Sequence, residues 1–174
     1  MKDVLCIYYS RTGNTKKAME EIAGELGAEV VELRDGADRT GWRGWLRCGL
    51  DAMRKNTRPV APVETARPLG EYRLVILGTP VWAGRTSAVM RSFLKERGSS
   101  IMRAFLKEHG QELKNVAYVV TRSSDGKFEE VYDQMDLYVN KPRKRAVSIC
   151  CGTVGSSFWR DEFLAGIRDG REDG

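Results

Sequence analysis

Runs of consecutive apolar residues alternate along this chain with stretches in which apolar residues recur every three or four positions. The runs predict strands over 4–9, 29–33, 74–77, 116–120 and 146–150. The run at 29–33 is half polar and suits a sheet edge, whereas the others predict strands buried on both faces. The helical spacing predicts helices over 15–26, 89–94, 101–106, 128–138 and 163–167. Strands that alternate in this way with helices indicate an α/β protein with a parallel sheet.

Length and composition agree with this interpretation. The chain has 174 residues, the usual size of one domain, so we expect a single domain over 1–174. A content of 41% apolar and 30% charged residues is typical of a globular protein and excludes a disordered chain. The sequence contains neither a signal-peptide pattern nor an apolar run of about 18 residues, so we expect a cytoplasmic protein without a membrane span.

The chain holds few residues that bind metals or act as nucleophiles. Its cysteines are Cys6, Cys48, Cys150 and Cys151, and His109 is the only histidine. A zinc site needs about four such ligands at recognisable spacings, and these spacings do not occur. We therefore expect reduced, packed thiols, no metal site and no Ser-His-Asp or Cys-His catalytic set.

The most informative motif follows the first strand and leads directly into the first helix. It consists of Ser10, Arg11, Thr12, Gly13, Asn14 and Thr15. Hydroxyl groups, a glycine and a helix N-terminus together favour a bound phosphate, because converging donors and the positive end of the helix dipole all attract an anion. The spacings of a Walker A loop, of a tyrosine-phosphatase loop and of a Gly-x-Gly-x-x-Gly motif are absent. The alternative is an ordinary helix start capped by threonine or asparagine.

Residues 9–15, Tyr-Ser-Arg-Thr-Gly-Asn-Thr, resemble the phosphate loop of the flavodoxin-like FMN proteins. The resemblance implies a three-layer αβα sandwich with a five-stranded parallel sheet in the order 2-1-3-4-5. It also implies that FMN binds where the strand order reverses, at the carboxyl ends of the first and third strands.

Two further loops correspond to the segments that flank the flavin ring in this family. The first consists of Thr79, Pro80, Val81, Trp82, Ala83 and Gly84, and the second of Thr121, Arg122, Ser123, Ser124, Asp125 and Gly126. An aromatic face beside backbone donors holds a flat, apolar ring well. The alternatives are a tryptophan in the core or at the surface, and an ordinary turn at 121–126. Arg122 departs from the family pattern, and the loop at 121–126 brings no aromatic residue of its own.

The net charge of +5 is concentrated in residues 39–58, which carry six basic residues and one acidic residue together with Trp42 and Trp45. The favoured interpretation is an amphipathic helix that covers the sheet with its arginines in solvent. Contact with an anionic membrane surface or an acidic partner is the alternative. We expect no nucleic-acid partner, because no known nucleic-acid-binding fold accompanies the charge.

The resemblance implies a redox protein that transfers electrons through non-covalently bound FMN. Because the flavin supplies the chemistry, we expect no catalytic acid or base from the chain. Its expected partner is a redox protein or a small acceptor such as a quinone. One alternative is an NAD(P)H-dependent FMN or quinone reductase with the same fold; another is a non-redox docking protein that uses the basic helix 39–58. Electron-carrying flavodoxins are typically acidic, whereas this chain is basic. We therefore expect a flavin environment that disfavours the reduced, anionic flavin less.

Overall fold

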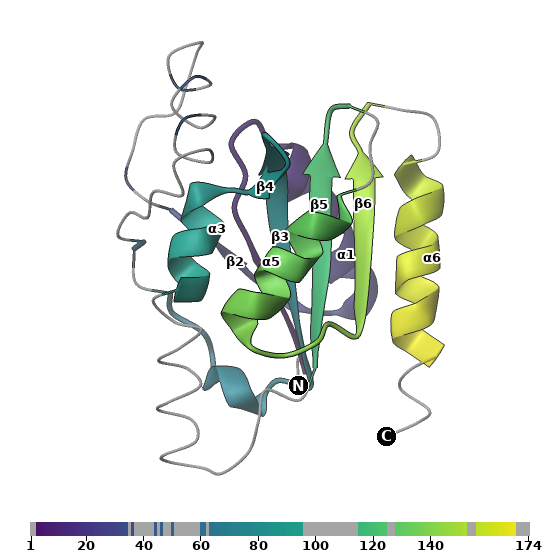
Figure 1. The fold of residues 1–174 in the computed structure, drawn as a ribbon. Helices are drawn as coiled ribbons and strands as arrows, with labels where there is room; N and C mark the ends of the chain where they lie inside the picture. The colour runs from purple at the N-terminus through teal and green to yellow at the C-terminus, as the bar shows by residue number, and fades with distance from the viewer. Residues whose placement is uncertain are drawn as a thin grey trace.

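A twisted parallel sheet forms the centre of the computed structural model (Figure 1). The structure describes residues 3–34, 36, 44, 46, 50, 60–61, 63–95, 115–124, 128–152 and 156–169. The parallel strands are β1 (Val4–Tyr8), β2 (Glu29–Glu32), β3 (Leu74–Trp82), β5 (Val116–Arg122) and β6 (Arg145–Cys150). They lie in the order β2-β1-β3-β5-β6, which is the predicted 2-1-3-4-5 when the parallel strands are counted along the chain. The half-polar β2 occupies an edge, as predicted.

The third strand is longer than predicted, and a sixth strand accompanies it. Instead of ending at Leu77, β3 continues to Trp82, and the two-residue β4 (Arg85–Thr86) pairs with it antiparallel. β1 pairs with β3 only as far as Tyr8 and Gly78, so the missing N–H of Pro80 interrupts no bond to β1. On its other side, β3 continues to pair with β5 as far as Pro80 and Thr121. Pairing with β5 therefore keeps Gly78, Thr79 and Pro80 in the extended conformation, although their sequence is typical of a turn.

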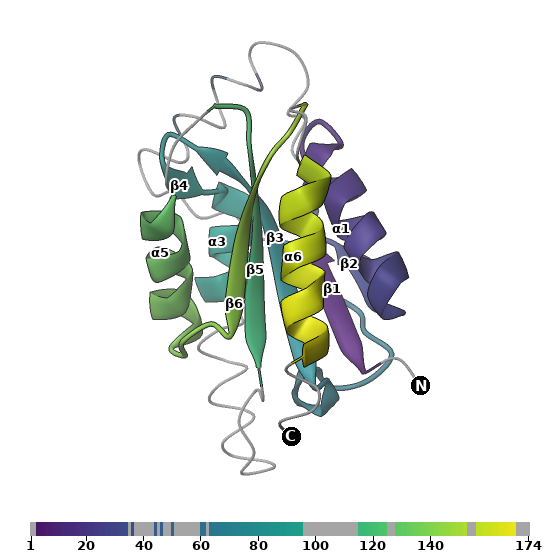
Figure 2. The ribbon, with the colours of Figure 1, turned by 90° about the vertical axis from the view of Figure 1, so that its right-hand side faces the viewer.

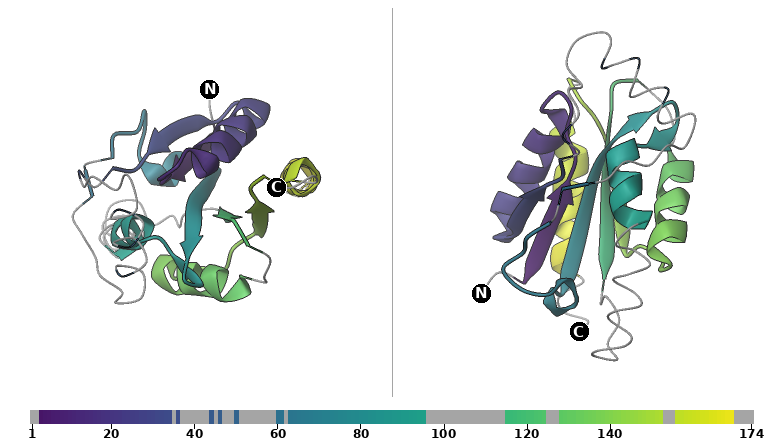
Figure 3. Two further views of the ribbon diagram at one scale, coloured as in Figure 1. Left: turned by 90° about the horizontal axis from the view of Figure 1, so that it is seen from above. Right: turned by 90° about the vertical axis from the view of Figure 1, so that its left-hand side faces the viewer.

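Helices cover both faces of the sheet and produce the predicted αβα sandwich (Figures 2 and 3). One layer contains α1 (Asn14–Leu26) and α6 (Ser156–Asp169), and the other contains α3 (Ala88–Phe93) and α5 (Glu129–Val139). A single 3-10 turn, η1 (Leu69–Glu71), precedes β3. The last helix begins at Ser156, seven residues before the predicted start at Phe163. The prediction missed these first turns because they are largely exposed and carry no apolar stripe.

Each face of the sheet buries its own apolar cluster. On one face Met19 and Ile22 of α1 and Phe163 of α6 pack against β1, β3 and β5. On the other, Met90 and Met135 lie in the cluster beneath α3 and α5. Salt bridges between α6 and α1, Arg160 to Glu21 and Arg168 to Glu25, join the two helices of the first layer. This packing fixes the N-terminus of α1 beside the carboxyl ends of the strands.

Several predicted features fall outside the described residues. They include the helix at 101–106, His109, Cys48 and most of the basic segment 39–58, of which only residues 44, 46 and 50 are described. Within the described ranges, every helix is too short or too polar to span a lipid bilayer.

Candidate functional site

A pocket of about 460 Å³ opens at the carboxyl ends of the central strands, and all three predicted loops line it. In open parallel sheets ligands bind at this end, where the strand order reverses. Here the reversal lies between β1 and β3. The volume falls within the range typical of small-molecule and cofactor sites, roughly 300–1,000 Å³.

The first loop contributes a helix N-terminus. Arg11, Thr12, Asn14 and Thr15 line the pocket. Helix α1 starts at Asn14 with Gly13 as its N-cap, in the left-handed region at φ +88°, and in the described structure no side chain caps it. The expected alternative, a helix capped by threonine or asparagine, is therefore wrong. The first N–H groups of α1, which carry the positive end of the helix dipole, therefore lie at the pocket.

Ser10 and Gly13 shape this loop but do not line the pocket. The Gly13 backbone N–H donates to Ser10 Oγ at 3.1 Å, which closes the loop into a tight turn. Ser10 therefore braces the loop, and Gly13 supplies a backbone conformation that residues with a Cβ rarely adopt.

A buried hydrogen bond joins the first loop to the third. Thr15 Oγ1 and Thr121 Oγ1 lie 2.7 Å apart, and both threonines are buried and line the pocket. Thr15 belongs to the first turn of α1 and Thr121 to the end of β5. The bond therefore fixes the helix N-terminus relative to the adjacent strand end, with hydroxyl groups at the junction.

The second loop is a β-hairpin rather than an irregular loop. Trp82 of β3 pairs with Arg85 of β4 across a two-residue turn, Ala83 and Gly84, whose φ angles are +48° and +68°. Two successive positive φ values characterise the type I′ turn that fits the twist of a hairpin. The pocket is lined by Pro80, Val81, Trp82, Ala83 and Gly84.

Thr79, predicted with this loop, does not line the pocket. It is fully buried, and its Oγ1 lies 3.0 Å from Ser87 Oγ and accepts from the Ser87 backbone N–H at 3.2 Å. Thr86 Oγ1 donates to the same atom at 3.3 Å. Ser87 in turn caps α3 by accepting from the Met90 N–H at 3.2 Å. Thr79 therefore anchors the hairpin to α3 and has a positioning role.

The third loop brings Arg122 to the pocket together with Thr121, Ser123 and Ser124. Arg122 Nε donates to Ser148 Oγ at 2.9 Å, and its Nη1 donates to the Ser124 carbonyl at 2.6 Å. These bonds hold the guanidinium beside strand β6. Asp125 and Gly126, predicted with this loop, lie outside the described residues.

Aromatic rings on two walls each lie next to a cation. The Arg11 guanidinium lies 5.6 Å from the centre of the Trp82 ring, and that of Arg122 lies 5.9 Å from the Phe128 ring. Contacts of this kind are favourable and hold both partners in place. Among the described lining residues there is no carboxylate. Trp82 and Phe128 therefore offer aromatic surface for a planar ligand, in a setting of positive charge.

Two lining residues, Phe128 and Cys151, are absent from the sequence prediction. The helical spacing assigned Phe128 to the core, and the fold does bury it in part, at the residue that precedes α5. Cys151 follows β6, and its backbone N–H donates to the Arg122 carbonyl at 2.9 Å. Burial raises its pKa, which favours the neutral thiol. Cys6 lies in the core, and burial raises its pKa to about 12, in keeping with the predicted packed thiol.

The donor set suits a ligand with an anionic group at one end and a planar ring system at the other. Helix N–H groups and threonine hydroxyls border one side, and indole and phenyl rings border the other. A flavin mononucleotide has this distribution of chemistry. The residues present therefore fit the cofactor implied by the sequence.

Comparison with known proteins places this geometry among related folds. No protein-family model matches the chain. An NAD(P)H dehydrogenase (quinone) of Paracoccus denitrificans (strain Pd 1222) is 32% identical in an alignment of length 108 that covers 56% of this chain and 46% of that protein. The chain thus spans less than half the length of this relative.

Solved structures match over nearly the whole chain. A flavoprotein in complex with FMN from Lactobacillus acidophilus NCFM aligns with a TM-score of 0.62 at 18% identity, over 91% of this chain and 99% of that one. A flavodoxin, WrbA-like protein from Agrobacterium tumefaciens aligns with a TM-score of 0.60 at 16% identity, over 97% and 94% of the two chains. At these identities the match establishes a shared fold.

Proposed function

We propose that this chain, which has the flavodoxin-like fold, binds FMN non-covalently in the pocket between its three loops and transfers electrons through it. One observation carries the proposal: the uncapped N-terminus of α1 and the aromatic walls at Trp82 and Phe128 border the same cavity. An anion site alone would suit many phosphates, and an aromatic cavity alone would suit many ligands. Their combination favours a ring that carries a phosphate.

The phosphate end is formed by residues that need no rearrangement to bind an anion. Thr12 and Thr15 have hydroxyl groups on the pocket wall, and the start of α1 supplies backbone N–H groups. Thr15 is held in place by its bond to Thr121. Such preorganised donors favour binding, because little conformational entropy is lost when the ligand arrives.

The ring end is formed by Trp82 and Phe128, each beside an arginine. When bound, the flavin ring supplies the redox chemistry. Trp82 and Phe128 would shield the bound ring from water, and Arg11 and Arg122 would place positive charge near it. Positive charge lowers the free energy of a reduced, anionic flavin relative to the oxidised, neutral flavin. The described lining residues therefore tune the cofactor through positive charge and burial.

A reductase activity is the second candidate, with NAD(P)H as the electron donor and a quinone as the acceptor. Two observations favour it. A relative with 32% identity is an NAD(P)H dehydrogenase (quinone), and the described pocket lining carries arginines without a carboxylate. A carrier that docks on basic proteins needs an acidic rim, which the described lining does not supply.

Titration with FMN tests the proposal directly. We expect saturable binding of one FMN per chain, measured by loss of flavin fluorescence. Absence of saturable binding by the folded protein contradicts the proposal.

Stepwise anaerobic reduction of the FMN-loaded protein then separates the two candidates. A long-wavelength absorbance band that rises and then falls indicates one-electron transfer, hence a carrier. Direct bleaching together with rapid NAD(P)H oxidation indicates the reductase.

A further inference from the structure

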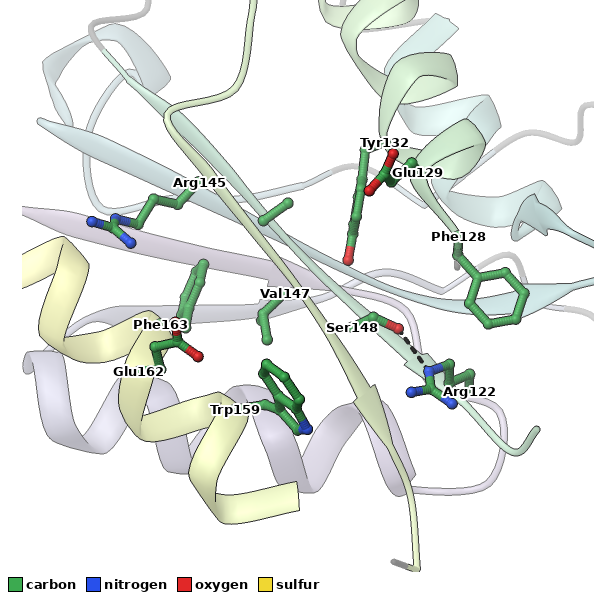
Figure 4. A pocket seen from close by; sticks show the side chains of 11 residues that line it. Arg122, Phe128, Glu129, Tyr132, Arg145, Val147, Ser148, Trp159, Glu162 and Phe163 are labelled. Atoms are coloured by element: carbon green, nitrogen blue, oxygen red, sulfur yellow. Dashed lines mark hydrogen bonds between the residues drawn. The ribbon is translucent and has the colours of Figure 1, made fainter. Parts of the chain in front are cut away.

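The last two residues of β5 serve opposite faces of the sheet. Along this strand the odd-numbered residues pack in the cluster beneath α1 and α6, and the even-numbered residues pack in the cluster beneath α3 and α5. The alternation continues at the pocket, where Thr121 bonds Thr15 of α1 and Arg122 bonds Ser148 of β6 (Figure 4). Thr121, which the sequence predicts beside the ring, is therefore joined directly to the phosphate end.

The bond between Thr15 and Thr121 is short and shielded from water. The two Oγ1 atoms lie 2.7 Å apart, the usual length of an O–H···O bond, and the residues are 2% and 4% exposed. Each hydroxyl group has one hydrogen to donate and lone pairs that accept. Because one hydrogen lies between the two oxygens, the pair has one hydrogen left to donate to a ligand in the pocket that both residues line.

An anion in the pocket determines the direction of this bond. If Thr15 donated to Thr121, the Thr15 oxygen would present only lone pairs to an anion at the start of α1, and the two would repel each other. If Thr121 donates instead, Thr15 keeps its hydrogen for the anion. Thr15 is the better direct donor, because it belongs to the first turn of α1, whose N–H groups also favour an anion. A hydroxyl group that accepts a hydrogen bond is also a stronger donor, because adjacent hydrogen bonds polarise each other.

We propose that Thr121 is a positioning residue for phosphate binding: its hydroxyl donates to Thr15 Oγ1 and so directs the Thr15 hydrogen toward the phosphate. The proposal rests on the proposed function for the identity of the ligand, since the phosphate is that of FMN. Riboflavin, which has the same ring without the phosphate, gains nothing from this bond. Thr121 therefore contributes to the selection of FMN over riboflavin, and it does so through Thr15.

Thr121→Val tests this role, because valine has nearly the shape of threonine and lacks the hydroxyl. We expect the Kd for FMN to rise about three- to tenfold, as the loss of one hydrogen bond between neutral groups implies, and the Kd for riboflavin to change less than about twofold. Thr121→Ser retains the hydroxyl and should bind FMN nearly as tightly as the original chain. Fluorescence titration measures these constants. Equal losses for FMN and riboflavin, or an equal loss of FMN affinity in the serine variant, would overturn the proposal.

A double-mutant cycle with Thr15→Val shows through which residue Thr121 acts. Thr15→Val removes the direct donor and should raise the Kd for FMN by about one to two orders of magnitude. Addition of Thr121→Val to that variant should then change the Kd by less than about twofold, because no Thr15 hydroxyl is left to direct. Additive losses would show that the two hydroxyls act independently, and a larger loss in Thr121→Val than in Thr15→Val would make Thr121 the direct donor. Either result overturns the proposal.

Inorganic phosphate separates this inference from the proposed function, because it supplies the anion without the ring. We expect phosphate to raise the Tm of the original chain and to raise that of Thr121→Val less. If the original chain binds no FMN but shows this difference, the proposed function fails and the positioning role stands. A rise of equal size in the two proteins overturns the positioning role alone, and absence of binding by both FMN and phosphate overturns both.

Discussion

The two ends of the flavin pocket are built in different ways. The residues of the phosphate end come from one continuous segment, Ser10 to Thr15, which the Gly13–Ser10 bond braces locally and the Thr15–Thr121 bond braces at longer range. The ring end is assembled from three segments: Trp82 comes from the β3–β4 hairpin, Arg122 from the end of β5, and Phe128 from the residue before α5. Local sequence thus determines one end, and tertiary packing determines the other.

The two ends also use different kinds of free energy. Hydroxyl and backbone donors bind an anion through directional hydrogen bonds, each worth about 1.5–3 kcal/mol when charge-assisted. Aromatic walls bind a ring through burial and dispersion, which depend on shape rather than charge. The difference implies that affinity for the phosphate and affinity for the ring can be changed separately. FMN and riboflavin, which has the same ring without the phosphate, measure the two contributions.

The largest expected effect is at the phosphate end. The double variant Thr12→Ala/Thr15→Ala removes two hydroxyl donors from the pocket wall. At about 1.5–3 kcal/mol each, their loss should raise the Kd for FMN by roughly two to four orders of magnitude. The Kd for riboflavin should stay nearly constant. Fluorescence titration with both ligands measures the two constants.

The matched control is Thr12→Ser/Thr15→Ser, which keeps both hydroxyls and should bind FMN nearly as tightly as the original chain. An unchanged FMN affinity in the alanine variant would show that the loop does not bind the phosphate. An equal loss for riboflavin would show that the two ends are not separable.

At the ring end, Trp82→Ala should affect both ligands alike. Trp82 is partly buried and lines the pocket. Removal of its stacking surface should weaken FMN and riboflavin equally, each by about 2 kcal/mol or roughly 30-fold. The ratio of the two Kd values should therefore remain that of the original chain. A ratio that changes more than about threefold would contradict the division of the pocket into two ends.

Local pattern was sufficient to predict most of the fold. The apolar runs of β1 and β5 and the helical stripe of α1 each identify an element that packs into the core. The errors have tertiary causes. The sequence Gly78-Thr79-Pro80 reads as a turn, yet β5 pairs with it and extends β3. The early turns of α6 are exposed, so no apolar periodicity marks the start of that helix.

The candidate site could be predicted where it is continuous in sequence. A glycine between hydroxyl residues at a strand–helix junction identified the first loop. Phe128 was missed because its helical spacing also suits the core, and Cys151 because nothing in its neighbourhood suggests a ligand. Thr79 was predicted to flank the ring, but it lies in the fully buried part of β3, where its hydroxyl bonds Ser87. The extension of β3 through Thr79 depends on pairing with β5, which the local sequence does not indicate.

The hairpin depends on Thr79 for its position. Thr79→Val keeps the size of the side chain but removes the hydroxyl that bonds Ser87 and Thr86. These buried polar groups then lose a partner, so the free energy of unfolding should fall by about 1–3 kcal/mol. Chemical denaturation measures the change. Thr79→Ser retains the hydroxyl and loses only the methyl group, so it should lose less; a loss in Thr79→Val no larger than that in Thr79→Ser would show that the hydroxyl contributes no more than the methyl group.

The smallest effect concerns backbone strain, where the two ends again differ. The phosphate end places glycine at its positive φ, Gly13 at +88°, whereas the ring end places alanine at +48° in Ala83. A left-handed alanine costs about 1–2 kcal/mol, and the extra freedom of glycine in the unfolded chain offsets about 0.5–1 kcal/mol. Ala83→Gly should therefore stabilise the protein by about 0.5 kcal/mol, a rise in Tm of roughly 1–2 °C.

Gly13→Ala is the opposite change and should destabilise the protein. A Cβ at Gly13 would meet no atom within 4 Å, so the cost lies in the backbone conformation alone. Opposite signs for these two variants in thermal denaturation would show that strain is stored at the ring end and avoided at the phosphate end; a Tm that falls in both would contradict this.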